Sequence, residues 1–235
     1  MDLSIVVPVR DERDNLEPLV EEIERRLASM PSFEILLIDD GSTDGSSERI
    51  CELAASRPRV RGVHFRHGAG QSAALDAGFR AAEGRTVVTI DADLQYDPED
   101  IPRLLEALDG NDAVAGYRVR RRDGWLKRVS SRIANGVRNA LSGDRVTDTG
   151  CSLKAFRSEC LRQVRPFDGM HRFLPTLLRM EGFRVIEVPV SHRARRHGRS
   201  KYGVRNRMVR GAIDLMAIRW MRRRRLSYEI VRTER

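Results

Sequence analysis

The stretch Thr86-Val87-Val88-Thr89-Ile90-Asp91-Ala92-Asp93 passes from a run of β-forming residues straight into two carboxylates. Unbroken apolar runs of this length are typical of strands whose two faces are both buried, as in a parallel sheet. Strands are also expected at Leu3–Val7, an apolar run that Pro8 ends, and at Phe33–Ile38, Val60–Phe65 and Asp112–Gly116. These segments of the first half of the chain are therefore predicted to be strands of one sheet.

Segments with a helical spacing of apolar residues separate these runs. Asn15 can cap a helix whose apolar positions are Leu16, Leu19, Val20, Ile23 and Leu27. Helices are also expected over 46–56, over 71–82 and from Pro98 to about Leu108. Strands that alternate with helices indicate an α/β fold with a mainly parallel sheet and helices on both faces. In such sheets ligands bind outside the carboxyl ends of the strands.

The second half of the chain is less regular. A helix is expected where apolar residues recur at helical spacing, at Leu126, Val129, Ile133, Val137, Ala140 and Leu141. Strands are expected over Thr149–Phe156 and Phe183–Val190, with a helix near 172–181 between them and a last helix over about 204–225. The sequence contains no internal repeat and no low-complexity linker that would mark a domain boundary.

The composition excludes several classes of protein. Of the 235 residues, 40% are hydrophobic and 33% charged, which excludes both a disordered polymer and an integral membrane bundle. The 3 cysteines lack the spacing of a disulfide scaffold or a zinc site and indicate a reducing compartment. The N-terminus lacks the pattern of a secretory signal, and no apolar run approaches the roughly 18 residues of a membrane span. We therefore expect a cytoplasmic protein.

Charge is distributed unevenly along the chain. The net charge of +9 combines residues 1–117, with 12 Lys and Arg against 24 Asp and Glu, and residues 118–235, with 31 against 10. The acidic half is suited to holding a cation and the basic half to facing anions. A nucleic-acid-binding module would also explain the basic half, but no recognised module pattern is present and the acidic half would repel phosphates.

Asp91-Ala92-Asp93 is the strongest candidate for a metal site. Two carboxylates one residue apart at a strand end can reach a hard divalent cation that bridges diphosphate oxygens, and Gln95 can add a neutral oxygen ligand. The alternative is an Asp-rich turn whose carboxylates cap helices. The strand-end position and the second pair, Asp39-Asp40, favour the metal.

Two loops of the first half allow more than one interpretation. Asp39–Gly45 has the composition of a turn before a helix, although Asp40 would alternatively bind a nucleotide base or ribose. His67–Ser72 is a glycine loop that enters a helix, either as a phosphate site or as a plain tight turn. The histidines His64, His171 and His192 lack the spacing of a metal site or a catalytic triad, and we interpret them as structural.

Basic residues gather near the C-terminus. The loop Arg195–Tyr202 combines cations, a glycine and a hydroxyl, and it either folds over a diphosphate or forms a solvated basic run. The last helix carries Val209, Ile213, Met216 and Trp220 on one face, with arginines around it. That pattern suits a helix in an anionic membrane interface. The alternatives are a helix packed on the core and a helix that contacts a membrane-embedded partner protein.

Several of these motifs together resemble a known family. Ile5–Glu12, Ile38–Gly45 and Asp91–Gln95 resemble the inverting family 2 glycosyltransferases of GT-A fold. Asp148–Cys151, Gly169–Pro175 and the Arg195–Tyr202 loop are similar to the polyprenyl-phosphate sugar transferases, the dolichyl-phosphate mannose synthase-like branch. The resemblance covers residues 3 to about 222 and implies a Rossmann-like GT-A catalytic domain.

The resemblance implies roles for individual residues. Those that would bind the nucleotide sugar are Pro8, Val9, Glu12, Asp40, Asp91, Arg195, Ser200 and Lys201. Asp93 and Gln95 would bind Mg²⁺ or Mn²⁺ on the diphosphate, and Arg118 and Arg132 would bind the acceptor phosphate. Asp93, Arg118 and Asp148 would act in catalysis, Asp148 as a base or as an orienting carboxylate.

These roles divide the chain into two parts. Residues 1–202 would form the GT-A catalytic domain, with a nucleotide and metal half at 1–117 and a basic acceptor half at 118–202. Residues 203–235 would form an amphipathic basic helix and tail on the membrane surface.

The expected reaction moves a sugar from a UDP- or GDP-sugar to a polyprenyl phosphate, such as undecaprenyl or dolichyl phosphate, with inversion at the anomeric carbon. The protein would be peripheral on the inner face of the cell membrane. A phosphate acceptor has a second pKa near ~6 and is already anionic at neutral pH, so it needs little help from a general base. The alternatives are a GT-A enzyme with a soluble acceptor and a basic nucleic-acid-binding protein. A processive polysaccharide synthase usually carries QxxRW, whereas Met216–Trp220 has Met in place of Gln.

Overall fold

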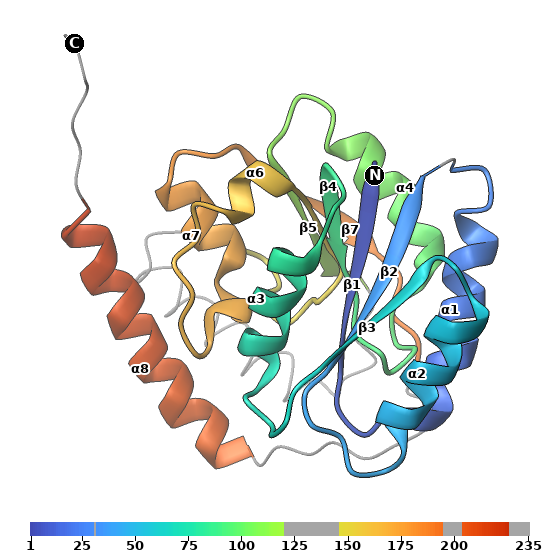
Figure 1. The fold of residues 1–235 in the computed structure, drawn as a ribbon. Coiled ribbons are helices and arrows are strands. Elements are labelled where there is room, and N and C mark those ends of the chain that lie inside the picture. The colour runs from blue at the N-terminus through green and yellow to red at the C-terminus, as the bar shows by residue number, and fades with distance from the viewer. Residues whose placement is uncertain (31, 120–145, 195–203, 226–235) are drawn as a thin grey trace, which may run out of the picture.

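A seven-stranded sheet forms the centre of the structure, a computed structural model that describes residues 1–30, 32–119, 146–194 and 204–225 (Figure 1). The strand order is β3-β2-β1-β4-β6-β5-β7. The strands are β1 (Leu3–Val9), β2 (Phe33–Asp39), β3 (Val60–His64), β4 (Thr86–Thr89), β5 (Ala113–Arg118), β6 (Lys154–Arg157) and β7 (Val185–Val190). β6 is antiparallel to both of its neighbours, and the other pairs are parallel.

Helices cover both faces of this sheet. They are α1 (Arg13–Arg26), α2 (Ser46–Ser56), α3 (Gln71–Ala81), α4 (Ile101–Ala107), α6 (Ser158–Leu161), α7 (Leu174–Met180) and α8 (Val204–Arg223), with short 3-10 turns η1 (Pro98–Asp100) and η2 (Met170–Arg172). Helices α1, α2 and α4 pack on one face, where Leu19 and Leu104 join the core. Helices α3, α6 and α7 pack on the other face, where Leu75 and Leu178 are buried. The predicted α/β class with a mainly parallel sheet is confirmed.

The order of the strands creates a crevice at one edge of the sheet. The chain builds β2 and β3 on one side of β1 and then places β4 on its other side. Connections that leave in opposite directions from neighbouring strands open a space at the carboxyl ends of those strands, and ligands bind there. β4 pairs with β1 only from Leu3 to Val6, so the end of β1 borders this space.

Pro8 does not end the first strand, contrary to the sequence prediction. β1 continues to Val9, and Pro8 pairs with Ile38 of β2. The carbonyl of Val6 accepts a hydrogen bond from Ile90 on the β4 side at 3.1 Å. Because alternate residues of a strand point their backbone groups to the same side, the missing N–H of Pro8 also faces that side, where β4 has ended.

The strand predicted over Thr149–Phe156 is mostly a loop. β6 begins at Lys154, which pairs with Thr89, the last residue of β4. On the β4 side, residues before Lys154 have no strand to pair with, and side chains make the contacts instead. Thr89 Oγ1 donates to the carbonyl of Ser152 at 2.6 Å, and the N–H of Asp91 donates to Ser152 Oγ at 3.2 Å. This loop therefore lies at the crevice.

Most other elements match their predicted spans to within two or three residues. Helix α1 begins at Arg13 rather than after Asn15, and Asn15 is buried inside it. The short helix α6 was not predicted. The helix predicted from Leu126 to Leu141 lies outside the described residues.

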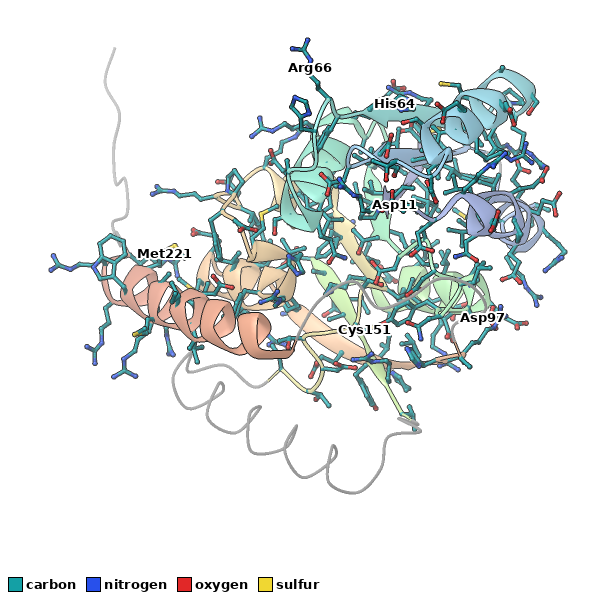
Figure 2. All side chains as sticks on the ribbon, turned by 90° about the horizontal axis from the view of Figure 1, so that it is seen from below. Asp11, His64, Arg66, Asp97, Cys151 and Met221 are labelled. Carbon is teal, nitrogen blue, oxygen red and sulfur yellow. The ribbon has the colours of Figure 1, made fainter. Side chains whose placement is uncertain are left out.

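Helix α8 lies against η2 and α7 at the side of the domain (Figure 1). Leu215 and Ile218, which are 8% and 0% exposed, pack with Met170, Phe173 and Leu177. Figure 2 shows Met221 on this helix and Cys151 nearer the middle of the molecule. Within the described part of the chain, no helix is both long and apolar enough to cross a bilayer.

The opposite face of α8 carries exposed apolar side chains. Ile213, Met216 and Trp220 are 56%, 62% and 63% exposed. The two interpretations of this helix, a membrane face and a core-packed face, thus concern different sides of the same helix. The side chain of Val209, predicted to share the apolar face, lies outside the described residues.

Candidate active site

A pocket of about 720 Å³ opens at the crevice. Its walls come from the ends of β1, β4 and β5, from α3, from the loop before β6, from η2 and α7, and from α8. The charged lining residues are Asp91, Arg118, Lys154, Arg172 and the ionisable His171, and the large apolar ones include Leu75, Phe173, Leu174 and Leu215. A pocket with this lining can take a ligand that is partly anionic and partly apolar.

The first turn of α3 and the residues just before it join three parts of this site. The N–H groups of Ala69 and Gly70 donate to Asp40 Oδ1 at 2.5 and 3.0 Å. Gln71 Nε2 donates to Asp91 Oδ1 at 2.9 Å. Ser72 Oγ lies 2.8 Å from His171 Nδ1. Consecutive residues thus hold the ends of β2 and β4 and the turn η2.

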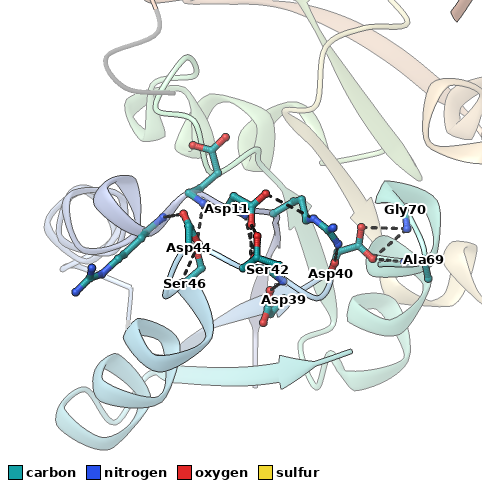
Figure 3. Close-up of polar contacts among 12 residues, drawn as sticks. Asp11, Asp39, Asp40, Ser42, Asp44, Ser46, Ala69 and Gly70 are labelled. Atoms are coloured by element: carbon teal, nitrogen blue, oxygen red, sulfur yellow. Dashed lines mark hydrogen bonds and ion pairs between the residues drawn. The ribbon is translucent and has the colours of Figure 1, made fainter. Parts of the chain in front are cut away.

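Asp40 has its carboxylate turned toward the glycine loop, as Figure 3 shows. It is 7% exposed, and Arg10 donates to its backbone carbonyl. In this structure the amides of the glycine loop bind the carboxylate of Asp40, which agrees with the interpretation of this loop as a tight turn. Asp40 does not line the pocket, and its predicted contact with the nucleotide stays a prediction.

The turn after β2 is held by hydrogen bonds within the Asp39–Ser47 segment (Figure 3). Burial alone would raise the pKa of Asp39, but hydrogen bonds from Ser42 and Ser47 outweigh it and lower the pKa. Gly41 has φ of +68°, and a Cβ there would lie 2.8 Å from the Gly68 nitrogen. Only glycine fits here, because two loops touch through their backbones.

Asp91, Asp93 and Gln95 follow β4 in a tight turn. The N–H of Gln95 donates to Asp93 Oδ1 at 3.2 Å, and Leu94 between them has φ of +57°, which is rare for a leucine. Asp91 lines the pocket and Asp93 is 7% exposed. Their carboxylate oxygens and the amide oxygen of Gln95 are the donor type that Mg²⁺ and Mn²⁺ prefer. The donor set fits the expected cation.

Arg118 and Asp148 form a forked pair at the end of β5. Arg118 Nε and Nη2 donate to the two carboxylate oxygens at 2.6 and 2.9 Å, and the N–H of Gly150 donates to Asp148 Oδ1 at 3.1 Å. Burial alone would lower the pKa of Arg118, but Asp148 outweighs it and the pKa is raised. Because both oxygens of Asp148 accept these bonds, the geometry favours an orienting carboxylate over a base.

Lys154 places a buried amine in the pocket wall. The residue is 3% exposed, and Nζ donates to the carbonyl of Cys151. Burial lowers the pKa of Lys154, while the nearby carboxylates of Asp91 and Asp148 act in the opposite direction. Burial also raises the pKa of the Cys151 thiol to about 11, so this cysteine stays protonated at neutral pH.

The structure gathers part of the predicted site around the pocket. Pro8, Asp91 and Arg118 line it, and Asp148 holds Arg118. Val9, Glu12 and Asp40 lie in the neighbouring strand end and loops outside its lining. Arg132, Arg195, Ser200 and Lys201 lie outside the described residues.

Sequence reasoning missed seven polar lining residues. They are Gln71, Thr89, Thr149, Ser152, Lys154, His171 and Arg172. A lysine inside an otherwise apolar strand was a usable signal for Lys154, because a charge at a buried strand position requires a partner. His171 was interpreted as structural, and no spacing in the sequence pairs it with Ser72.

Comparison with known proteins identifies relatives over most of the chain. Residues 4–165 match the family model described as Glycosyl transferase family 2. The chain is 42% identical over 206 residues to an undecaprenyl-phosphate 4-deoxy-4-formamido-L-arabinose transferase of Edwardsiella ictaluri, covering 86% of this chain and 63% of the relative. It is 36% identical over 230 residues to a dodecaprenyl-phosphate galacturonate synthase of Rhizobium johnstonii, covering 95% and 68%. The chain thus spans about two thirds of the length of these relatives.

Solved structures share the fold. Glucosyl-3-phosphoglycerate synthase from Mycobacterium tuberculosis, in complex with Mn²⁺, UDP and phosphoglyceric acid, matches with a TM-score of 0.70 at 23% identity, over 94% of this chain and 78% of that one. The mannosyltransferase PcManGT from Pyrobaculum calidifontis, in complex with GDP-Man and Mn²⁺, matches with a TM-score of 0.68 at 23% identity, over 92% and 63%. At this identity the likeness establishes the fold, and it agrees with the expected GT-A architecture.

Proposed function

The chain belongs to glycosyl transferase family 2, and on that premise we propose that it transfers a sugar from a UDP- or GDP-sugar to a polyprenyl phosphate. Both curated relatives described above are named for polyprenyl-phosphate substrates or products, which supports this acceptor class. The observation that carries the proposal is the pocket, whose lining combines Arg118 and Lys154 with apolar side chains. An isoprenoid phosphate presents the same two chemistries, an anionic head and an apolar chain.

The donor would bind along the ends of β1, β2 and β4. Pro8, Val9, Glu12, Asp40 and Asp91 would contact the nucleoside, by analogy with the family resemblance. Arg195, Ser200 and Lys201 would hold phosphates of the donor. The solved neighbours named for complexes with UDP and with GDP-Man support a nucleotide sugar as the donor class.

A divalent cation is proposed at Asp93 and Gln95. Such an ion would supply a Lewis acid that stabilises the departing nucleoside diphosphate. Among the described residues no group of three or more His, Cys, Asp and Glu side chains could hold a metal on its own. The ion would therefore take further ligands from the diphosphate or from water. Neighbouring structures solved with Mn²⁺ support this cofactor class.

The residues of the acceptor side would position an oxygen that is already charged. Arg118, held in one orientation by Asp148, would bind the acceptor phosphate together with Arg132. Attack by a phosphate oxygen on the anomeric carbon would form the new bond as the nucleoside diphosphate leaves from the opposite face, which inverts the configuration. No strong base is needed, because the nucleophile is anionic at neutral pH.

The membrane surface would be bound through the outer face of α8. Ile213, Met216 and Trp220 are exposed there, and Arg222, Arg223 and Arg224 follow at the end of the helix. An apolar face flanked by arginines is suited to an anionic lipid interface. The protein would then act as a peripheral enzyme on the inner face of the cell membrane, and contact with a membrane-embedded partner protein is the alternative use of this face.

The test is release of nucleoside diphosphate across a panel of UDP- and GDP-sugars with Mn²⁺ or Mg²⁺, with and without a polyprenyl phosphate in detergent. We expect release from one donor that requires the lipid. Release that requires a soluble phosphate compound instead would replace the acceptor class, and no release from the folded protein with any donor would contradict the proposal.

A further inference from the structure

Ser72 and His171 form a polar pair between α3 and η2. Ser72 is 4% exposed and lies in the first turn of α3. Its Oγ accepts a hydrogen bond from the N–H of Gly169 at 3.0 Å and lies 2.8 Å from His171 Nδ1.

The proton of Ser72 determines the tautomer of His171. A serine hydroxyl has one proton to donate and accepts through its lone pairs. Gly169 uses one lone pair of Oγ, and among the described residues Nδ1 of His171 is the one acceptor within hydrogen-bond distance of the buried hydroxyl, so its proton is directed to Nδ1. A neutral imidazole that accepts at one nitrogen carries its own proton on the other. His171 is therefore an Nε2–H donor.

The turn that carries His171 is fixed on both sides. Gly169 has φ of +104°, and a Cβ at this position would lie 2.5 Å from a carboxylate oxygen of Asp214 in α8. Arg172 Nη1 lies 3.5 Å from Asp214 Oδ2, and Met170 is buried beneath α8. These contacts hold η2 against α8, so that Ser72 meets the ring of His171 in a set geometry.

His171 lines the same pocket as Arg118 and Lys154. We propose that His171, held as the Nε2–H tautomer by Ser72, donates a hydrogen bond to the phosphate group of the acceptor. This inference rests on the proposed function. His171 would be a substrate-binding residue, and Ser72 a positioning residue that acts through it.

The tautomer also bears on the class of acceptor. A hydroxyl acceptor needs a base that removes its proton, and the lone pair of His171 is used at Nδ1 by Ser72. A phosphate acceptor needs donors, which Arg118, Lys154 and the Nε2–H group of His171 supply. The pair thus suits a nucleophile that arrives already deprotonated.

Two substitutions separate the binding role from a structural one. In His171→Asn the side-chain amide takes the place of Nδ1 and retains the contact with Ser72, whereas in His171→Gln it takes the place of Nε2. The test compares binding of farnesyl phosphate and of farnesol to the full chain in detergent. We expect wild type to bind farnesyl phosphate more tightly than farnesol, and His171→Gln to keep most of that preference. In His171→Asn the affinity for farnesyl phosphate should fall by about tenfold.

A matched control is available at the far side of the sheet. His64 also has its Nδ1 near an oxygen, Asp39 Oδ2 at 3.5 Å, but does not line the pocket. His64→Asn and His64→Gln should leave farnesyl phosphate binding unchanged. If His171→Asn binds as wild type does, or loses no more than His171→Gln, this inference alone fails. If wild type does not distinguish farnesyl phosphate from farnesol, the proposed acceptor fails and this inference with it.

The tautomer is measured independently of any ligand. Nitrogen-15 NMR of histidine-labelled protein separates Nε2–H from Nδ1–H rings, and the signal of His171 is identified by its absence in His171→Asn. We expect an Nε2–H ring in wild type and a shift toward the other tautomer in Ser72→Ala. An Nδ1–H ring in wild type would overturn the inference.

Discussion

Arg118 Nε and Nη2 donate to opposite oxygens of Asp148, at 2.6 and 2.9 Å, so that the carboxylate fixes both the position and the rotation of the guanidinium plane. A single hydrogen bond would leave the plane free to turn. The side chain of Arg118 is 19% exposed and that of Asp148 4% exposed, so water competes little with this fork. Arg118 therefore faces the pocket in one orientation.

We expect Asp148→Asn to lower turnover by roughly 10²-fold, because an amide turns an N–H group toward the guanidinium and misplaces it. The free energy of unfolding should fall by about 2 kcal/mol. Steady-state kinetics and denaturant unfolding measure both effects. Asp76→Asn, at an exposed pair with Arg80, is the matched control and should change neither. The double variant Asp148→Asn with Arg118→Lys should lose little more turnover than the more affected single variant, because the two residues act as one unit. If the losses of the two single variants add in free energy, the orienting role is contradicted.

Asp93→Ala should abolish the response of turnover to Mn²⁺ and lower the rate by roughly 10²-fold or more, because a departing diphosphate would lose its cation. Turnover measured against metal concentration tests this. Asp97→Asn serves as the control, since Asp97 lies in the same loop and pairs with Arg193. A metal response in Asp93→Ala equal to that of wild type would remove the assignment.

Lys154→Met should raise stability and lower activity. The pKa of Lys154 is lower in the folded chain than in the unfolded chain because it is buried, so folding with a charged Lys154 costs free energy. That cost is present at neutral pH and disappears as pH rises toward the unfolded pKa of about 10.4. The stability gain of Lys154→Met, measured by denaturant unfolding, should therefore shrink as pH rises from neutral toward the unfolded pKa. A gain that grows with pH would contradict this account.

Substitutions on the outer face of α8 should affect membrane binding, whereas substitutions on its inner face should affect stability. Replacing Ile213, Met216 and Trp220 with serine should leave the melting temperature unchanged, because all three are more than half exposed. Binding to anionic vesicles, measured by co-sedimentation, should weaken by about tenfold or more, and wild-type binding should weaken with added salt.

Ile218→Ser is the matched change on the inner face of α8. Ile218 is 0% exposed, so this variant should lose about 3 kcal/mol of stability by leaving a cavity and burying a hydroxyl. Vesicle binding by the triple serine variant at wild-type strength would exclude the outer face as the membrane contact.

The alternation of strands and helices was sufficient to predict the fold, because buried strands and amphipathic helices have different periods. Helix α2 over Ser46–Ser56 was predicted with both of its ends. The antiparallel β6 was not distinguished from a parallel strand, since direction depends on which neighbours a strand meets after the chain has folded. The extension of β1 through Pro8 likewise depends on where β4 stops.

The candidate site was predictable where one local segment holds several functional groups. Asp91, Asp93 and Gln95 lie within five residues, and their position at a strand end, together with the second pair Asp39-Asp40, favoured a cation. His171 pairs with Ser72 across 99 positions of the sequence, and no local pattern encodes such a contact. The same holds for Arg118 and Asp148, which are 30 residues apart; they were selected only because the family resemblance implied their roles.

The turn of chain from Ala69 to Ser72 binds Asp40, Asp91 and His171 through successive residues. These four residues therefore connect the side of the site assigned to the nucleotide with the side assigned to the acceptor. A substitution there that repositions one side displaces the other. Attempts to evolve a new donor preference in this chain should accordingly find tolerated variants in the flanking loops, while residues 69–72 stay constant.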